Sequence, residues 1–176
     1  MDERAMTKDE IVKILTQLGE RLAEKGIQGE MYLVGGAAMA LAYDARRVTR
    51  DIDAVFAPKT EIYQEARTIA EELGLPESWL NDSVKGFLSR NDERRIPVLE
   101  TPGLRVMAAS PRFMFAMKCL ASRREDEDDI RLLLRVLGVR NLQAALDIVE
   151  EVYPDRAIPP RTQFFLEEVL GEDGPK

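Results

Sequence analysis

Two short motifs constrain this chain most strongly, Gly35-Gly36 and Asp51-Ile52-Asp53, with fourteen residues between them. The first directly follows an apolar run, Met31-Tyr32-Leu33-Val34, which predicts a buried strand. Glycines at the end of a strand let backbone N–H groups approach a ligand that a Cβ atom would keep away. Gly35 and Gly36 are therefore predicted to cradle phosphate.

The second motif begins a stretch in which apolar and polar residues alternate, from Asp51 to Phe56. In a strand, alternate side chains point to the same face, so the carboxylates of Asp51 and Asp53 should lie side by side. Two adjacent carboxylates repel each other unless a cation lies between them. Oxygen ligands of this kind suit Mg²⁺ or Mn²⁺.

The uncharged stretch 37–43 joins the motifs and predicts a buried helix. Taken alone, a Gly-Gly pair is most often a tight turn, and paired acids are most often solvated or cap a helix. Together they predict a unit of strand, glycine turn, helix, loop and acidic strand that returns the acids to the glycines. Such a unit indicates metal-assisted phosphoryl or nucleotidyl transfer.

The pattern of Gly35-Gly36, a helix, Arg47, Thr49 and Asp51-Ile52-Asp53 resembles the polymerase-β-like nucleotidyltransferase superfamily, in particular its minimal and toxin-type AbiEii-like branches. Further motifs are similar to an uncharacterised bacterial nucleotidyltransferase family of DUF6036 type: Trp79-Leu80-Asn81-Asp82, the segment 116–123, Asp126 and Asp129-Ile130. The resemblance covers most of residues 30 to 137.

This resemblance implies an α+β fold, with a small mixed β-sheet of the nucleotidyltransferase type packed by helices and a C-terminal helical extension. We expect a catalytic core at residues 1–110 and a helical region at 111–176 packed on it. A chain of 176 residues is long enough for one domain with a hydrophobic core and such an extension.

Local signals predict the other elements. The capping box Thr7-Lys8-Asp9-Glu10 starts a helix that runs to about Gly26, and a second helix runs from Pro58 to Gly74. Pro102-Gly103 joins a hairpin, and 76–95 is expected to be a loop near the site. Strands are expected at 96–100 and 104–107, and helices at 111–122, 125–137, 141–152 and 160–170.

Composition excludes several classes of enzyme. The chain has no histidine, which rules out Ser-His-Asp or Cys-His catalysis and histidine-ligated zinc. Its one cysteine, Cys119, cannot form an internal disulfide and is expected to be buried in a helix. No apolar stretch is long enough to span a membrane, and Met1-Asp2-Glu3-Arg4 is too charged for a signal peptide. We expect a cytoplasmic protein with no membrane partner.

The net charge of −7 argues against a general nucleic-acid binder, but the charge is uneven. Residues 46–140 hold 17 basic and 16 acidic side chains, so this middle part is +1. Two arginine groups within it could meet phosphates, although such clusters are more often solvated or ion-paired. They are Arg46, Arg47 and Arg50, and Arg90, Arg94 and Arg95.

The candidate site has Asp51 and Asp53 as metal ligands and Gly35 and Gly36 as phosphate-binding backbone. Polymerase-β-like catalysis usually adds a third carboxylate from a neighbouring strand, and Glu100 is the candidate because it is the one acid in the hairpin strands. A solvent-facing glutamate at a strand end is an equal alternative. Three further residues are expected to help bind the nucleotide: Arg47, Thr49 and Arg50.

Lys118 is unusual because it lies inside an apolar helix, Phe113 to Leu120. Its ammonium could simply extend to solvent. The resemblance instead implies a triphosphate-binding lysine that neutralises the leaving pyrophosphate. Asp126 is placed with it as a nucleotide-binding residue, and Arg123 and Asp129 as residues that orient the lysine or touch the ligand.

The predicted function is Mg²⁺-dependent transfer of a nucleoside monophosphate from a nucleoside triphosphate to an acceptor hydroxyl. Resemblance to toxin-type members implies a tRNA end or a protein as acceptor, and a cognate antitoxin as partner. One alternative is a small-molecule nucleotidyltransferase of the antibiotic-modifying type. Another is a catalytically degenerate module that binds a nucleotide or a partner. The C-terminal Leu142, Ala145, Ile148 and Val149 could then form a homodimer or partner face, or equally be core.

Overall fold

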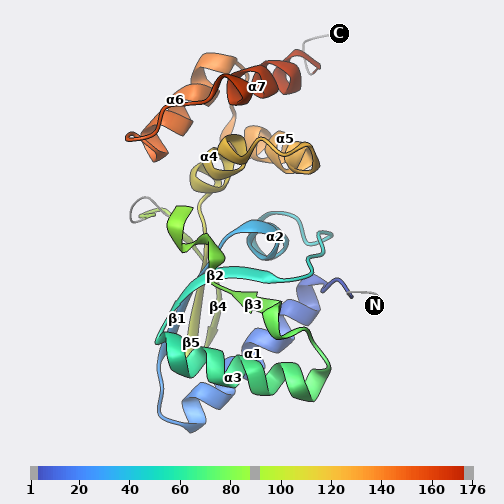
Figure 1. The fold of residues 1–176 in the computed structure, drawn as a ribbon, viewed down its shortest axis with the longest axis vertical. Coiled ribbons are helices and arrows are strands. Elements are labelled where there is room, and N and C mark those ends of the chain that lie inside the picture. Colours follow the sequence, from blue (N-terminus) through green and yellow to red (C-terminus); the bar gives the residue numbers. More distant parts are fainter. Residues whose placement is uncertain (1–3, 88–91, 173–176) are drawn as a thin grey trace. The chain divides into compact units, whose positions relative to one another are not determined.

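The structure, a computed structural model, describes residues 4–87 and 92–172 and divides the chain into two compact units. The first comprises residues 1–88 and 93–109, and the second 89–92 and 110–176. Figure 1 labels their helices and strands. Their identity with the two expected domains stays a prediction.

The first unit contains a five-stranded mixed sheet in the order β3-β2-β1-β5-β4. β1 is antiparallel to β2 and parallel to β5, while β2 is parallel to β3 and β4 is antiparallel to β5. The predicted α+β class is confirmed. The strands are β1 (Gly29–Leu33), β2 (Ile52–Ala57), β3 (Leu80–Asn81), β4 (Ile96–Thr101) and β5 (Leu104–Ala108).

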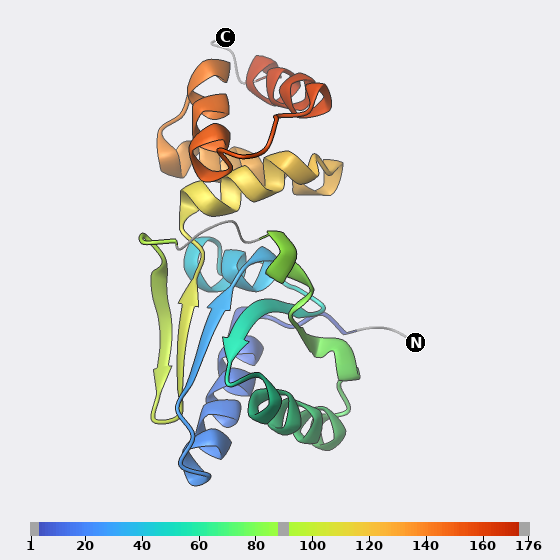
Figure 2. The ribbon, with the colours of Figure 1, turned by 60° about the vertical axis from the view of Figure 1, so that its left-hand side comes forward.

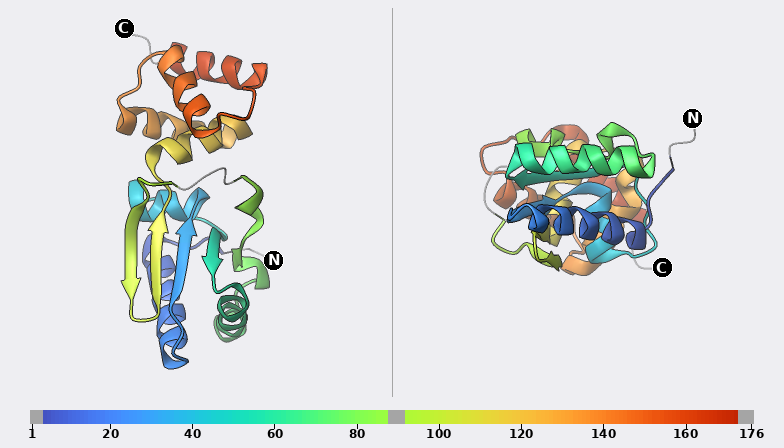
Figure 3. Two further views of the ribbon diagram at one scale, coloured as in Figure 1. Left: turned by 90° about the vertical axis from the view of Figure 1, so that its left-hand side faces the viewer. Right: turned by 90° about the horizontal axis from the view of Figure 1, so that it is seen from below.

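Two long helices, α1 (Lys8–Glu24) and α3 (Lys59–Leu73), pack on one face of this sheet and against each other. The predicted capping box begins α1, because Thr7 N–H donates to Glu10 Oε2 at 2.9 Å and Glu10 N–H donates to Thr7 Oγ1 at 3.3 Å. The left view of Figure 3 shows the strands in front of α1. The apolar stripe of α1 is buried there: Ile11, Ile14, Leu15, Leu18 and Leu22.

The two faces of the sheet differ in burial because side chains alternate along each strand. The face toward the helices is buried and carries Met31, Leu33, Ile52, Ala54, Leu104 and Val106. The opposite face carries side chains that are only half-buried or exposed. Three of its residues, Tyr32, Val55 and Met107, are half-buried.

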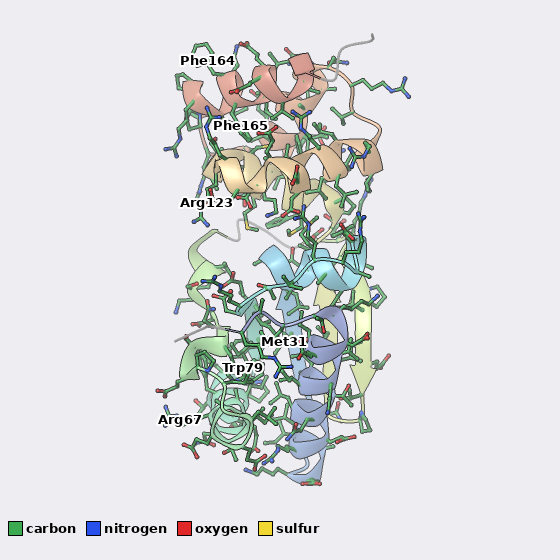
Figure 4. All side chains as sticks on the ribbon, turned by 90° about the vertical axis from the view of Figure 1, so that its right-hand side faces the viewer. Met31, Arg67, Trp79, Arg123, Phe164 and Phe165 are labelled. Carbon is green, nitrogen blue, oxygen red and sulfur yellow. The ribbon has the colours of Figure 1, made fainter. Side chains whose placement is uncertain are left out.

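The segment predicted as a loop at 76–95 is instead partly structured. It contains the 3₁₀ turns η2 (Glu77–Trp79) and η3 (Ser83–Phe87), with β3 between them. Trp79 is buried, and its indole N–H donates to the Ala66 carbonyl at 2.9 Å. Figure 4 labels Trp79 and Met31, two core residues of this unit. The loop prediction is therefore wrong for these residues, while 88–91, with Arg90, lie outside the described part of the chain.

The second unit is helical, as Figure 2 shows, and confirms the predicted C-terminal helices. Ser110 and Asn141 cap α4 and α6, and Gly138 ends α5 with a φ of +68°. Its elements are α4 (Pro111–Ala121), η4 (Arg124–Asp126), α5 (Glu127–Leu137), α6 (Leu142–Val152) and α7 (Pro160–Glu172). Over the described ranges 4–87 and 92–172, no helix is long and apolar enough to cross a membrane.

The apolar face of α6 is core rather than an open surface. Ala145, Ile148 and Val149 are buried, and α6 packs against α4 and α7. The partner-face alternative is wrong for these three residues, because this unit already covers them, while the fourth residue, Leu142, is half-buried. Cys119 is buried as predicted, and burial raises the pKa of its thiol above the ordinary value.

Candidate active site

The turn after β1 brings Gly35 against Asp53. Val34 N–H donates to the Asp53 carbonyl at 3.0 Å, so the chain leaves β1 beside the start of β2. Gly35 has a φ of +63°, and a Cβ atom on it would lie 3.2 Å from Asp53 Oδ2. Both the backbone conformation and the close carboxylate favour glycine at this position.

Gly36 is packed equally closely against Thr49. A Cβ atom on Gly36 would lie 2.7 Å from Thr49 Oγ1 and 2.9 Å from Thr49 Cβ. The Thr49 hydroxyl donates to the Asp51 carbonyl at 2.9 Å, and Thr49 N–H donates to the Met6 carbonyl at 3.0 Å. Thr49 thus positions the loop before Asp51, and its predicted contact with the nucleotide stays a prediction. The structure brings together the glycines, Thr49 and Asp53, which lie apart in the sequence.

A helix begins directly at the glycines, as predicted for residues 37–43. It starts as α2 (Gly35–Ala38) and continues as a π-helical turn, η1 (Met39–Tyr43), whose Tyr43 hydroxyl donates to the Ala109 carbonyl. The N–H groups of a first helical turn have no partner within the helix, and they carry the positive end of its dipole. The Gly35-Gly36 turn therefore offers backbone donors beside the Asp53 carboxylate.

The two aspartates lie at the beginning of β2. β2 starts at Ile52, one residue later than predicted, so Asp51 precedes it and is exposed, whereas Asp53 is within it and half-buried. The Asp53 carboxylate beside the glycine turn, with Asp51 two positions earlier in the chain, fits a divalent cation whose other ligands would come from phosphate or water. In residues 4–87 and 92–172 there is no group of three or more His, Cys, Asp or Glu side chains able to hold a metal.

Glu100 does not join these aspartates. It pairs across the hairpin with Arg105, and Arg105 is level with Glu30 and Ala57 at the far end of the sheet. Ala57 is four residues along β2 from Asp53, roughly 13 Å, and β4 is three strand spacings from β2, roughly 14 Å across the sheet. Glu100 is also 74% exposed and lies 3.5 Å from the Arg105 guanidinium. The prediction that Glu100 supplies the third carboxylate is wrong for this geometry.

Asn81 occupies a place near Asp53 that the sequence analysis did not assign. It is the Cα partner of Asp53 in the parallel pair β2 and β3, so both side chains point to the same face. Its Oδ1 accepts bonds from Ser83 N–H at 3.3 Å and from the Ser83 hydroxyl at 2.6 Å. Its presence in the motif Trp79-Leu80-Asn81-Asp82 was the available signal, but only the strand pairing places it.

The arginines near the acidic strand have different surroundings. Arg46 is exposed and bonds to Asp44 at 3.1 Å, which lowers the pKa of that carboxyl. The Arg47 guanidinium is half-buried, with Nε 4.0 Å from Asp44 Oδ2, and Arg50 is exposed. Arg94 and Arg95 are exposed just before β4. Arg47 and Arg50 shortly precede Asp51 in the chain, and their role in nucleotide binding stays a prediction.

Residues 10–156 match a protein family described as "Nucleotidyltransferase of unknown function (DUF6036)". The chain belongs to this family. The family resemblance predicted from residues 30 to 137 is thereby confirmed, and so is the coarse function of a nucleotidyltransferase family member.

One solved structure is similar to this chain. No curated protein matches the chain. The crystal structure of an antigenic nucleotidyltransferase-like protein from Paracoccidioides brasiliensis is similar, with 16% sequence identity and a TM-score of 0.49. The similarity covers 96% of this chain and 95% of that one.

In the second unit of this family member, Lys118 lies in a cluster with two aspartates. Its ammonium is 2.8 Å from Asp126 Oδ1 and 3.0 Å from Asp129 Oδ2, and its side chain is 8% exposed. Lys118 therefore does not extend to solvent. The cluster brings together Lys118 and Asp126, which were both predicted to bind the nucleotide. However, the two carboxylates already neutralise the Lys118 ammonium, the charge that would otherwise attract a triphosphate.

A second charged cluster lies in the first unit, next to Asn81 in the chain. Asp82 accepts a bond from the Tyr63 hydroxyl at 2.8 Å and lies 2.6 Å from Lys59 Nζ. The hydrogen bond from Lys59, followed by that from Tyr63, lowers the pKa of Asp82 to about 2. Lys85 Nζ is 3.6 Å from the same carboxylate. This cluster ties the end of β3 to the beginning of α3.

Proposed function

We propose that this protein is a Mg²⁺-dependent nucleotidyltransferase that moves a nucleoside monophosphate from a nucleoside triphosphate to an acceptor hydroxyl. The observation that carries the proposal is the 3.2 Å separation between Asp53 Oδ2 and the Cβ position of Gly35. It puts a carboxylate beside the backbone N–H groups of the glycine turn, and carboxylate ligands and backbone donors are the two parts that metal-bound phosphate needs.

Each part of the site has a separate task. Asp51 and Asp53 would hold the cation, and the N–H groups of the Gly35-Gly36 turn would bind phosphate oxygens. When bound, Mg²⁺ would balance the charge of the triphosphate and lower the pKa of the acceptor hydroxyl. Thr49 fixes Asp51 through its bond to the Asp51 carbonyl at 2.9 Å. We place Arg47 and Arg50 beside the phosphates.

The reaction is an in-line displacement at the α-phosphorus. The acceptor oxygen forms a new bond to this phosphorus, the bond to the bridging oxygen breaks, and pyrophosphate leaves. Because the chain has no histidine, the acceptor proton would pass to a carboxylate at the site or to water. Mn²⁺ would serve in place of Mg²⁺ with the same oxygen ligands.

We infer that the acceptor is a macromolecule, either a tRNA end or a protein side chain, with a cognate antitoxin as natural partner. This inference rests on the sequence resemblance to toxin-type nucleotidyltransferases. The same resemblance implies that Lys118 and Asp126 bind or orient the triphosphate. Their close ion pair makes a structural role the competing explanation.

The test is incubation of the purified protein with Mg²⁺, total cellular RNA and each of four α-³²P-labelled nucleoside triphosphates. We expect label on tRNA-sized RNA or on protein, with accompanying release of pyrophosphate. Label on added aminoglycosides alone would favour the small-molecule alternative. Absence of label on every acceptor, despite Mg²⁺-dependent triphosphate binding, would favour a regulatory module.

Two variants make this experiment specific. Asp51→Asn/Asp53→Asn removes both carboxylate charges with little change of shape, and we expect it to abolish labelling. Asp9→Asn removes an exposed carboxylate in the first turn of α1 and serves as the matched control. Equal labelling by the double variant and the unmutated protein would contradict the proposed site.

A further inference from the structure

An apolar row crosses the sheet on the face that bears Asp53. The strand registers place Val55 beside Tyr32, Tyr32 beside Met107, and Met107 beside Pro97. These four residues, which we call the Tyr32 strip, come from four neighbouring strands. Since partners in register point to the same face, the strip is continuous and roughly 14 Å long.

The strip lies on the face away from α1 and α3. Tyr32, Val55 and Met107 are half-buried and Pro97 is exposed, whereas their neighbours Met31, Leu33 and Val106 are buried under the helices. In the left view of Figure 3, no described helix of this unit lies in front of β1, β5 and β4.

The strip is adjacent to the candidate site. Asp53 and Val55 are two residues apart in β2 and point to the same face, so they are separated by roughly 7 Å along the strand. A triphosphate held at Asp53 and the glycine turn would direct its nucleoside either toward this strip or away from the sheet. The strip is an apolar surface on the same face.

Polar residues follow the strip on its far side. Glu30, Arg105 and Glu100 form the next row on this face, and they line a hollow of about 430 Å³ with Gln28, Ala57 and Pro58. The face therefore runs from carboxylates, through an aromatic and apolar row, to a polar hollow. A nucleotide has the same order of chemistry: phosphates, a flat ring, and a ring edge with hydrogen-bonding groups.

We propose that the Tyr32 strip is the platform on which the base of the bound nucleoside triphosphate stacks, with Tyr32 as the principal contact. The proposal rests on the proposed function, since it needs the triphosphate at Asp53. Stacking on an aromatic side chain is tolerant of base identity because every base has a π face. All four nucleotides should therefore gain from Tyr32.

The experiment compares binding of the four Mg²⁺–nucleoside triphosphates with binding of Mg²⁺–tripolyphosphate by isothermal titration calorimetry. Tripolyphosphate carries the anionic part of the ligand without the base. We expect each nucleotide to bind at least tenfold more tightly than tripolyphosphate. Tyr32→Ala should weaken nucleotide binding about tenfold and leave tripolyphosphate binding unchanged, whereas Tyr32→Phe should retain both.

Two further variants guard against unfolding and general effects. Tyr32→Leu keeps apolar bulk without the aromatic ring, and it should resemble Tyr32→Ala in binding while melting close to the unmutated protein. Leu73→Ala removes an apolar side chain that is 48% exposed at the end of α3, and it should change neither ligand's affinity.

The outcomes separate the two proposals. The platform proposal is overturned, and the proposed function stands, if tripolyphosphate binds through Asp53 and nucleotides bind no more tightly. The same conclusion follows if nucleotides still bind more tightly than tripolyphosphate in Tyr32→Ala and Tyr32→Leu. If neither ligand binds in a manner that Asp53→Asn removes, the proposed function fails, and the platform fails with it.

Discussion

Gly35 and Asp53 face each other across the beginning of β2, with 3.2 Å between the glycine's Cβ position and Asp53 Oδ2. This contact joins the end of β1 to the antiparallel strand beside it. Both residues are held by the sheet, because Val34 N–H donates to the Asp53 carbonyl at 3.0 Å. A site built on paired strands is held in position more firmly than one built on a loop.

Gly35→Ala should abolish Mg²⁺-dependent triphosphate binding. The added methyl group enters the space beside Asp53. The alanine backbone must also keep a φ of +63°, which costs about 1 kcal/mol of stability. Gly26→Ala is the matched control, because Gly26 has a φ of +70° and no atom within 4 Å of its Cβ position. Calorimetry should show lost binding for Gly35→Ala alone, with similar melting temperatures for both variants. Equal binding by the two variants would show that the space beside Asp53 is not needed.

Glu100→Gln should leave metal-dependent nucleotide binding and transfer unchanged within twofold. Glu100 lies at the far end of the sheet, where its carboxylate is 3.5 Å from Arg105. Asp53→Asn, assayed in parallel, should lose at least a hundredfold in transfer rate. A comparable loss for Glu100→Gln would return this residue to the metal site and contradict the register of β4 and β5.

Asp82→Asn removes the ion pair with Lys59 and should lower the free energy of unfolding by about 1 kcal/mol at pH 7. The effect is this small because the carboxylate is partly solvated. The pKa of Asp82 is about 2 when folded, below its ordinary value of 3.8. Its contribution is therefore present above about pH 4 and is lost as the pH falls toward 2. Urea unfolding at pH 7 and pH 3 should show the difference between the variant and the unmutated protein becoming smaller in acid. A constant difference would mean that Asp82 acts through packing.

Lys118→Met should destabilise the protein by about 3 kcal/mol, because it leaves Asp126 and Asp129 without their shared cation. Lys118→Met/Asp126→Asn/Asp129→Asn should recover part of this loss. Lys85→Met, at a lysine that is 65% exposed, is the control and should change stability by less than about 0.5 kcal/mol. Denaturant unfolding measures these effects. Unchanged stability with lost triphosphate binding would instead support the triphosphate-binding role.

Much of the local structure could be predicted because it depends on short-range chemistry. The Thr7 and Glu10 capping box, the glycines after the helices and the alternation in β2 act over a few residues. The candidate site was predictable in part for the same reason. Its glycines and aspartates belong to one short unit of strand, helix and strand. The helix in this unit returns the chain to β1, so that β2 pairs with it.

The residues that required the tertiary structure are those whose neighbours come from distant elements. Strand order separates Glu100 from the aspartates and places Asn81 beside Asp53, while helix packing encloses Trp79 and pairs Lys118 with Asp126. The sequence by itself determined the family and the α+β class, and it predicted an acidic site beside a glycine turn. Only the tertiary structure decided which side chains share a face with that site, because strand register depends on packing of the whole sheet.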